Sequence, residues 1–267
     1  MGFSVDGSDG RARAGTLSTT HGDVPTPLFM PVATAGSVRT LSPEELVEAG
    51  TRALISNSYS LLVRPGAEAI EEAGGLHDFM RWKGPIFTDS GGFQMVRKGF
   101  LVRKDDDSVR FKDHVKGIVR ELTPEGVVEL EEGLGADVAM VLDDCPPAGA
   151  DRDVVEDATR RTTLWARRCM EARARDDQQL WAITQGGVME DLRAASTRDL
   201  VAMGFDGYGI GGLSIGEPVE EMRRVIDGSI DIIPADRPRY LMGVGSPREV
   251  LDAVAVGIDV FDSAFPT

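Results

Sequence analysis

The sequence has few residues that could build a metal site or a disulfide framework. It contains 2 cysteines and 3 histidines among 267 residues. A structural zinc site takes four such ligands, and a disulfide-rich fold needs several cysteine pairs, so zinc or redox chemistry carried by this chain alone is not expected. Hydrophobic runs are short too, because none approaches the roughly 18 apolar residues of a membrane-spanning helix. The first residues also lack the basic start and apolar core of a secretory signal, so we expect a cytoplasmic protein without membrane contact.

Lysine is scarce as well. The formal net charge is -15, and lysine stands only at positions 83, 98, 104, 112 and 116. So acidic a chain is not an obvious nucleic-acid partner, although an excess of acid also occurs in salt-adapted proteins. The length and the hydrophobic share of 42% fit one large domain, residues 1–267, at the usual barrel length of about 250 residues.

The stretch at 85–94 (PIFTDSGGFQ) sets a pattern that recurs along the chain. A short apolar run predicts a buried strand, and it stops at Asp89 before two glycines, where the backbone can turn and approach a ligand. Any single aspartate there is better explained as a cap of the next helix. Six such endings in series instead predict a parallel barrel with its chemistry at the carboxyl ends of the strands. The other five runs are 137–142, 180–184, 207–210, 240–242 and 258–261.

Two earlier apolar runs, 28–32 and 53–55, complete the eight strands of an α/β (β/α)8 TIM barrel. Ser42, Thr123 and Ser246 are each followed by proline, which is typical of a capped helix start. No covering helix follows the last strand, so we expect the final helix to lie beyond Thr267 or to come from another chain. The remaining helices are predicted at 65–73, 151–175, 189–203, 217–229 and 250–256.

Two antiparallel additions to the barrel are expected. Residues 3–27 alternate polar and apolar side chains with glycines between them, which predicts an N-terminal hairpin. Residues 101–104 and 109–112 predict a second hairpin, inserted after the third strand. The second hairpin carries a basic spot, and a solvated face explains it as well as a binding role does. The spot consists of Arg103, Lys104, Arg110 and Lys112.

Acids on different strands that face one pocket suit chemistry at a sugar anomeric carbon. One acid acts as nucleophile and the other moves the proton of the leaving group, and Asp89 and Asp262 are the candidates. Asp143 and Gln185 offer acceptors and a donor that could read the edge of a purine-like base, while glycines 211 and 212 permit close approach. Paired acids in barrels also serve aldolases, isomerases and metal hydrolases, so the residues alone leave those open.

Longer motifs resemble one family over nearly all 267 residues. They resemble the queuine tRNA-ribosyltransferase family, also called tRNA-guanine transglycosylase, and the GGFQ wording is similar to its bacterial and eukaryotic branches. The motifs are FMPV at 29–32, NSY at 57–59, LVRPG at 62–66, HDFM at 77–80, WKGP at 82–85, TDSGGFQ at 88–94, QG at 185–186, GFDGY at 204–208, GGL at 211–213, GEP at 216–218, RYLMGVG at 239–245 and FD at 261–262.

This resemblance implies an enzyme of queuosine biosynthesis, which exchanges guanine at the tRNA anticodon wobble position for a 7-deazaguanine, preQ1 or queuine. Asp262 would attack the ribose C1′ to form a covalent intermediate, with Asp89 as proton acceptor. Val32 and Ile215 match positions that line the base pocket. The implied base-binding residues are Asp89, Ser90, Gly91, Gly92, Phe93, Asp143, Gln185 and Gly212. The implied RNA-binding residues are Gly243, Val244, Gly245, Ser246, Pro247, Arg248 and Glu249.

The sequence departs from the family after Asp262. The family continues into an arginine-rich segment and a zinc site of three cysteines and a histidine, which neither Cys145 nor Cys169 matches. We therefore expect no metal and no cofactor in this chain, a barrel truncated after its eighth strand, and either a homodimer or a companion chain carrying the zinc portion. Ser60 also stands where many relatives carry histidine.

Other readings remain open. The chain could be a non-catalytic or split subunit of a heteromeric transglycosylase, or a relative acting on DNA. Four polar groups retained in one pocket argue against a mere scaffold. Among the neighbouring residues, Asp144 is expected to be a solvated or capping acid, Asn57 to fix a turn or orient Asp89, and Phe93 either to stack on the base or to join the core.

Overall fold

The computed structural model describes residues 1–95 and 99–267. Eight parallel strands run in the order β4-β14-β13-β12-β11-β10-β6-β5. A bridge between Val32 and Ile55, with a 2.7 Å hydrogen bond from the Ala33 amide to the Ile55 carbonyl, joins the first and last strands of this order. The predicted (β/α)8 barrel is therefore confirmed. The strands are β4 Leu28–Pro31, β5 Leu54–Asn57, β6 Ile86–Asp89, β10 Val138–Met140, β11 Gln179–Thr184, β12 Gly207–Ile210, β13 Arg239–Leu241 and β14 Val260–Ser263.

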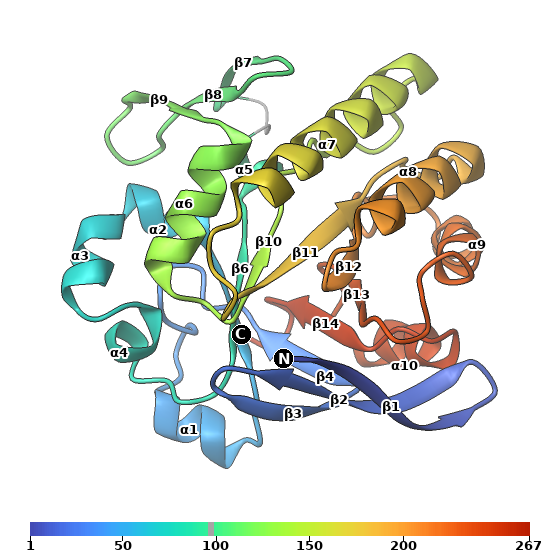
Figure 1. The fold of residues 1–267 in the computed structure, drawn as a ribbon, viewed down its shortest axis with the longest axis horizontal. Helices are drawn as coiled ribbons and strands as arrows, with labels where there is room; N and C mark the ends of the chain where they lie inside the picture. Colours follow the sequence, from blue (N-terminus) through green and yellow to red (C-terminus); the bar gives the residue numbers. More distant parts are fainter. Residues whose placement is uncertain (96–98) are drawn as a thin grey trace.

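Figure 1 shows these strands at the centre of the molecule, with the helices around them. Ser42 accepts a hydrogen bond from the amide of Glu45, whose carboxylate accepts one from the Ser42 amide, so the predicted capping box is confirmed. Three short helices, α2, α4 and α5, were not predicted, because four to six residues are too few to show a helical period. The helices are α1 Pro43–Glu48, α2 Ser58–Val63, α3 Ala67–Glu72, α4 Leu76–Met80, α5 Gly92–Met95, α6 Pro124–Leu134, α7 Arg152–Ala172, α8 Glu190–Met203, α9 Val219–Ile230 and α10 Pro247–Ala255.

Both antiparallel additions are present, and each is a three-stranded sheet where two strands were predicted. The N-terminal sheet crosses one end of the barrel, at the bottom of Figure 1. It consists of β1 Gly2–Asp9, β2 Ala12–Thr19 and β3 Gly22–Thr26. The inserted sheet consists of β7 Leu101–Lys104, β8 Val109–Lys112 and β9 Val119–Leu122, and it lies beside α7 at the top of the figure.

Three aromatic rings fill the barrel interior below the site. Phe87, Trp181 and Tyr240 come from strands that are not neighbours, so they can meet only inside the barrel. Their centroids lie 5.3 to 6.4 Å apart in edge-on arrangements, and all three are fully buried. This packing supports the strand ends that carry the polar residues.

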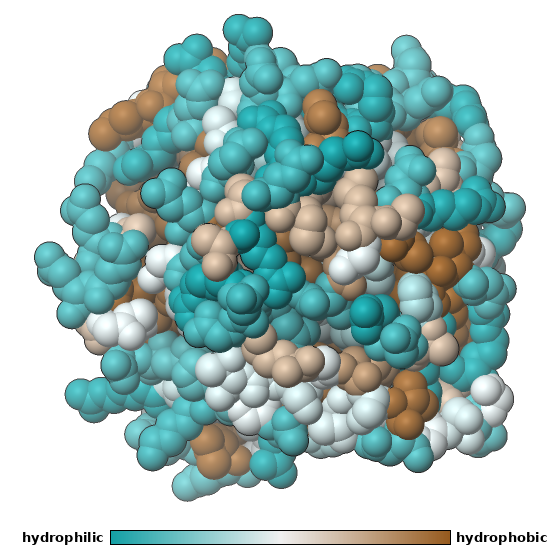
Figure 2. Space-filling view, viewed as in Figure 1, coloured by the Kyte–Doolittle hydropathy of each residue, from teal (hydrophilic) through white to brown (hydrophobic). Residues whose placement is uncertain are grey.

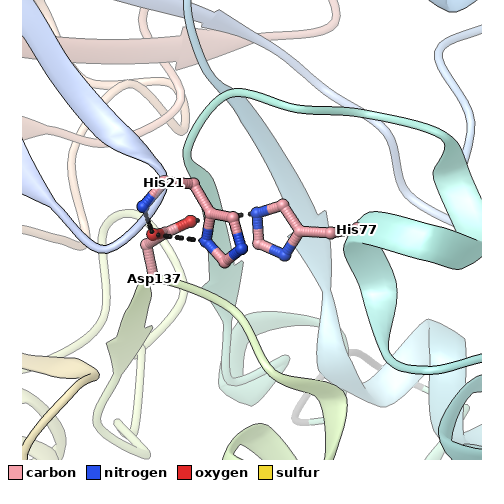
Figure 3. A group of neighbouring side chains, drawn as sticks. All are labelled: His21, His77 and Asp137. Carbon is pink, nitrogen blue, oxygen red and sulfur yellow. Dashed lines mark hydrogen bonds and ion pairs between the residues drawn. The ribbon is translucent and has the colours of Figure 1, made fainter.

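Two histidines, His21 and His77, contact the carboxylate of Asp137 beside the N-terminal sheet (Figure 3). Asp137 precedes β10 and is 1% exposed, and its oxygens lie 2.9 Å from Nδ1 of His21 and 3.1 Å from Nε2 of His77. The same carboxylate accepts hydrogen bonds from the amides of His21 and Ile86. These bonds hold the pKa of Asp137 down to about 2 despite its burial. Asp137 thus ties the β2–β3 turn and α4 to the barrel.

Hydrophilic residues cover most of the face shown in Figure 2, with apolar residues in small separate groups. Among the described residues, no helix combines the length and apolar character needed to cross a membrane.

Candidate active site

A pocket of about 330 Å³ opens at the carboxyl ends of the barrel strands. Its walls combine apolar side chains with carboxylates from three different strands or the loops after them. The lining residues are Val32, Thr34, Ile55, Ser56, Asn57, Asp89, Phe93, Gln94, Asp143, Cys145, Gly211, Gly212, Leu213, Ser214, Ile215, Tyr240, Met242, Gly243 and Asp262.

Asp89 ends β6, and its side chain is fixed by Asn57. The Asn57 Nδ2 donates to Oδ2 of Asp89 at 2.8 Å, while the Asn57 Oδ1 accepts from the Ser60 amide and caps α2. Both expected roles of Asn57, fixing a turn and orienting Asp89, are therefore confirmed. Burial, and then the charge of Asp262, raise the pKa of Asp89 to about 6. Such a group can both release and take up a proton near neutral pH.

Asp262 lies on β14, and one of its two carboxylate oxygens is held by hydrogen bonds. Its Oδ1 accepts from the Tyr240 hydroxyl at 2.6 Å and from the Gly243 amide at 2.7 Å. No residue in the described part of the chain donates to its Oδ2. Burial raises the pKa of Asp262, and these two hydrogen bonds oppose the rise. The arrangement presents one carboxylate oxygen to the pocket in a fixed orientation.

Asp143 follows β10 and is 5% exposed. Gln185 donates from Nε2 to Oδ2 of Asp143 at 2.7 Å, and its buried amide oxygen has no hydrogen-bond partner among the residues that the structure describes. Burial, then the charges of Asp89 and Asp144, raise the pKa of Asp143 to about 7. Carboxylate and amide therefore form one polar unit, with Asp143 at the pocket wall and Gln185 behind it.

The glycines of the site are required by close packing. A Cβ on Gly92 would lie 2.4 Å from both the carbonyl oxygen and Oδ1 of Asp143. A Cβ on Gly91, which has φ +84°, would lie 2.3 Å from Cβ of Tyr59. A Cβ on Gly212 would lie 2.3 Å from Oε1 of Gln185. These contacts fix the turn after β6 and the loop after β12 against Asp143 in the pocket wall and against Tyr59 and Gln185 behind it.

The predicted base-binding residues divide into two groups. Asp89, Phe93, Asp143 and Gly212 line the pocket, as do Val32 and Ile215. Ser90, Gly91, Gly92 and Gln185 do not line it and instead form the layer behind its wall. Phe93 is 38% exposed on α5, at the pocket.

The predicted RNA-binding segment lies at the rim and continues away from the pocket. Gly243 lines the pocket, while Val244 is buried in the apolar core. A Cβ on Gly245 would lie 2.2 Å from Cβ of Ser263, so this glycine is packed too. The other four residues begin α10, with Ser246 accepting from the Glu249 amide at 3.4 Å, Pro247 at the first turn and Arg248 exposed.

One expectation is wrong, and one residue that contributes to the site was missed. Asp144 is not a solvated acid: it is fully buried and paired with Lys104 and Arg161, both at 2.6 Å. The sequence around Asp144 did not indicate its burial, because its two cationic partners lie 17 and 40 positions away along the chain. Tyr240 was read only as a strand residue, although its hydroxyl reaches Asp262. The strand alternation could have pointed to it, since Tyr240 and Met242 share one face and Met242 also lines the pocket.

Among the described residues, the two cysteines lie apart from each other. Cys145 lines the pocket, and Cys169 lies on α7 in the core, with its thiol near the Pro124 carbonyl. His21, His77 and Asp137 lie close enough to share an ion. However, the imidazole rings are stacked 3.5 Å apart and 17° from parallel, so their in-plane lone pairs do not converge on one point. This geometry fits two hydrogen bonds to a shared carboxylate.

The fold and the pocket define a (β/α)8 barrel protein with buried carboxylates gathered at the carboxyl ends of its strands. The chain belongs to the queuine tRNA-ribosyltransferase family, whose model matches residues 8–267. It is 51% identical to the queuine tRNA-ribosyltransferase of Desulforamulus reducens, over 96% of this chain and 70% of that protein. It is 49% identical to the queuine tRNA-ribosyltransferase of Gloeobacter violaceus, over 99% of this chain and 70% of that protein. It is 47% identical to that of Thermus thermophilus, over 99% of this chain and 69% of that protein.

Proposed function

We propose that this chain is a tRNA-guanine transglycosylase that exchanges guanine at the anticodon wobble position for a 7-deazaguanine. One observation carries the proposal: Asp89 and Asp262, both with raised pKa, face one pocket in a chain about half identical to queuine tRNA-ribosyltransferases. Two carboxylates on opposite sides of a reacting sugar are the usual arrangement for glycosyl transfer with retention.

In the first half-reaction the Oδ2 of Asp262 attacks the ribose C1′ of the guanosine. The C1′–N9 bond breaks as the C1′–O bond forms, and the departing guanine takes the proton of neutral Asp89. A pKa of about 6 leaves a usable protonated fraction of Asp89 near neutral pH. The product is an ester between Asp262 and tRNA, together with free guanine.

The second half-reaction reverses these steps with a new base. Ionised Asp89 takes the N9 proton of the 7-deazaguanine, N9 attacks C1′, and the carboxylate of Asp262 is released. Ping-pong kinetics follow from this order. Ionised Asp143, held by the amide of Gln185, accepts hydrogen bonds from the N–H groups on the edge of the base. Gly212, which has no side chain, lets the backbone approach the ring.

The proposal names tRNA and the free base as partners, and RNA contact at 243–249. A cytoplasmic location and assembly as a homodimer or with a companion chain carrying a zinc-binding portion belong to the same proposal. The chain itself is proposed to use no metal and no cofactor.

Exchange of radiolabelled guanine into unmodified tRNA tests this function, with Asp262→Ala as the matched control. We expect incorporation by the wild-type chain and none by the variant. A wild-type chain that stays silent both alone and after addition of a zinc-bearing relative's C-terminal portion contradicts catalysis and favours the non-catalytic subunit. Full exchange by Asp262→Asn contradicts the nucleophile assignment, and labelling of a DNA hairpin in preference to tRNA favours the DNA alternative.

A further inference from the structure

The inserted sheet touches the pocket wall from behind at two places. On β7, Lys104 reaches Asp144, the residue after Asp143. On β8, the buried ring of Phe111 packs edge-on against Tyr59 at 5.1 Å, and Tyr59 in turn lies directly over Gly91. The sheet therefore supports both turns that carry pocket carboxylates, the one after β6 and the one after β10.

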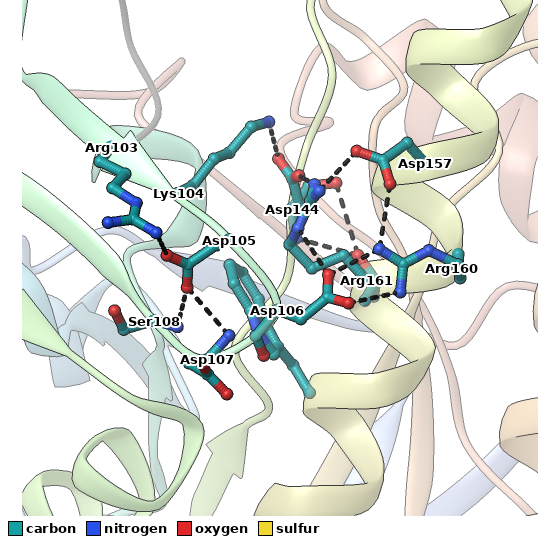
Figure 4. A network of polar contacts seen from close by, with 12 residues as sticks. Arg103, Lys104, Asp105, Asp106, Asp107, Ser108, Asp144, Asp157, Arg160 and Arg161 are labelled. Carbon is teal, nitrogen blue, oxygen red and sulfur yellow. Dashed lines mark hydrogen bonds and ion pairs between the residues drawn. The ribbon is translucent and has the colours of Figure 1, made fainter.

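Asp144 is the centre of a polar network between the barrel, the inserted sheet and α7 (Figure 4). Its two oxygens pair with Lys104 and Arg161, each at 2.6 Å, and its amide donates to the buried Oγ1 of Thr162 at 2.9 Å. Arg161 also pairs with Asp157 on its own helix. Both carboxylate oxygens and the amide of Asp144 are thus bonded to partners from other elements.

The outer part of the network fixes the β7–β8 turn to α7. Asp106 in this turn pairs with Arg160 at 2.6 Å, and its carbonyl accepts from the indole of Trp165 at 3.0 Å. Arg168 donates to the same carbonyl at 2.9 Å. Because the turn is held in place, the position of Lys104 at the end of β7 is defined.

Burial of Asp144 next to Asp143 has an electrostatic consequence. The titratable and charged groups that act on Asp143 are Asp89 from β6, Asp144 on the same loop and the neighbouring thiol of Cys145. The two acids raise the pKa of Asp143 after burial does, whereas burial raises the pKa of Cys145 to about 12, so that the thiol stays neutral. Lys104 and Arg161 are the cations that compensate Asp144, and Lys104 is the one supplied by the insertion.

We propose that Asp144 is a positioning residue for the base-reading carboxyl of Asp143, and that Lys104 extends this role to the inserted sheet. Asp144 places the loop through its two ion pairs, and the cations limit the negative charge that Asp143 experiences. This inference rests on the proposed function, since it concerns how the pocket holds the base.

Direct binding of preQ1, measured by calorimetry between pH 5.5 and 9 without tRNA, tests the proposal. In Lys104→Met a cation is lost near two acids. We therefore expect the pH below which binding weakens (the acid limb) to move up by about one unit, and the affinity at pH 7 to fall about fivefold. Lys104→Arg restores the pairing and is expected to bind like wild type. The double variant Lys104→Met with Asp144→Asn removes the buried charge together with its cation, and returns the limb toward its original pH.

Lys112→Met is the matched control, because Lys112 is an exposed lysine on the adjacent strand of the same sheet. It is expected to leave the affinity and the pH limb unchanged, and thermal unfolding of each variant checks that the chain folds. A Lys104→Met protein with wild-type affinity and pH limb overturns the inference and leaves the proposed function intact. The inference is also overturned if Lys104→Met binds preQ1 more weakly with an unchanged pH dependence and the added Asp144→Asn substitution does not restore the affinity. Wild-type protein that does not bind preQ1 at all overturns the proposed function as well.

Discussion

Tyr240 and Asp262 lie on neighbouring strands, and the phenolic hydroxyl donates to Oδ1 of the carboxylate at 2.6 Å. Burial raises the pKa of this tyrosine well above its usual value, so it remains a donor throughout the working pH range. The Gly243 amide donates to the same oxygen, and Asp262 lines the pocket. Asp262 is therefore oriented by a residue whose role is invisible in the sequence motif that ends at Phe261-Asp262.

Tyr240→Phe removes this bond and keeps the ring. A hydrogen bond to a charged group contributes roughly 1.5 to 3 kcal/mol, so we expect formation of the covalent tRNA adduct to slow by about 10- to 100-fold. In the wild type the Tyr240 bond lowers the pKa of Asp262. Its removal therefore raises that pKa, and the pH below which the rate declines should move upward. Single-turnover trapping of the adduct measures both effects. Tyr208→Phe on β12, outside the pocket, is the control, and equal rates for both variants contradict the assigned role.

Asp143→Asn tests the ionisation of the base-reading carboxyl. The pKa of Asp143 is about 7 in the folded protein, so base binding that needs the carboxylate weakens as the pH falls below 7. The variant should bind preQ1 weakly at every pH and show no such limb. Calorimetry at several pH values measures this, and a limb retained in Asp143→Asn assigns the titration to another group.

The same substitution affects stability with a definite sign. Asp143 ionises near 3.8 when unfolded and near 7 when folded, so the wild-type free energy of unfolding falls as the pH rises between these values. Asp143→Asn lacks this loss and should be more stable than wild type above pH 7, but not at pH 4. Urea unfolding at both pH values compares them. A wild-type protein as stable as the variant at pH 8 contradicts the raised pKa.

Gly92→Ala tests the packing of the wall. The new methyl group would lie 2.4 Å from the carbonyl oxygen and Oδ1 of Asp143, so the loop that carries this carboxyl must shift. Overpacking of this kind costs about 1 to 3 kcal/mol, and where that cost falls on the binding conformation of the loop we expect base affinity to fall about 5- to 150-fold. Gly228→Ala on α9, where a Cβ meets nothing within 4 Å, should leave affinity unchanged. Equal preQ1 affinity in both variants would show that the wall can adapt.

Asp137→Asn tests the histidine-carboxylate tie beside the N-terminal sheet. The pKa of Asp137 is held near 2, so its ionised form stabilises the fold above pH 4 by about 2 kcal/mol, and this contribution is lost as the pH falls toward 2. The variant should therefore be less stable than wild type at pH 7, and the difference should shrink at pH 3. Urea unfolding at both values gives the result. Asp23→Asn, at an exposed position in the same sheet, should change little, and a pH-independent difference for Asp137→Asn argues against the tie.

Much of the fold could be predicted from local pattern. The apolar runs are short, those that stop at Asp89 and Asp143 are each followed by a helix, and such alternation of strand and helix has few solutions other than a parallel barrel. The third strand of each antiparallel sheet and the short helix after Asn57 could not be predicted. Segments of four to six residues carry too little periodicity, and their conformation is decided by what they pack against.

The sequence by itself determined that Asp89, Asp143 and Asp262 lie at the same end of the barrel, because the carboxyl ends of parallel strands must meet there. It determined the pairing of Asp89 with Asp262 and the need for glycine at the turns. Only the tertiary structure decided which oxygen of Asp262 is held, that Gln185 stands behind Asp143, and that Asp144 is buried between Lys104 and Arg161. Hydrogen bonds and ion pairs between residues 17 to 42 positions apart depend on packing distances, and spacing along the chain does not encode those distances.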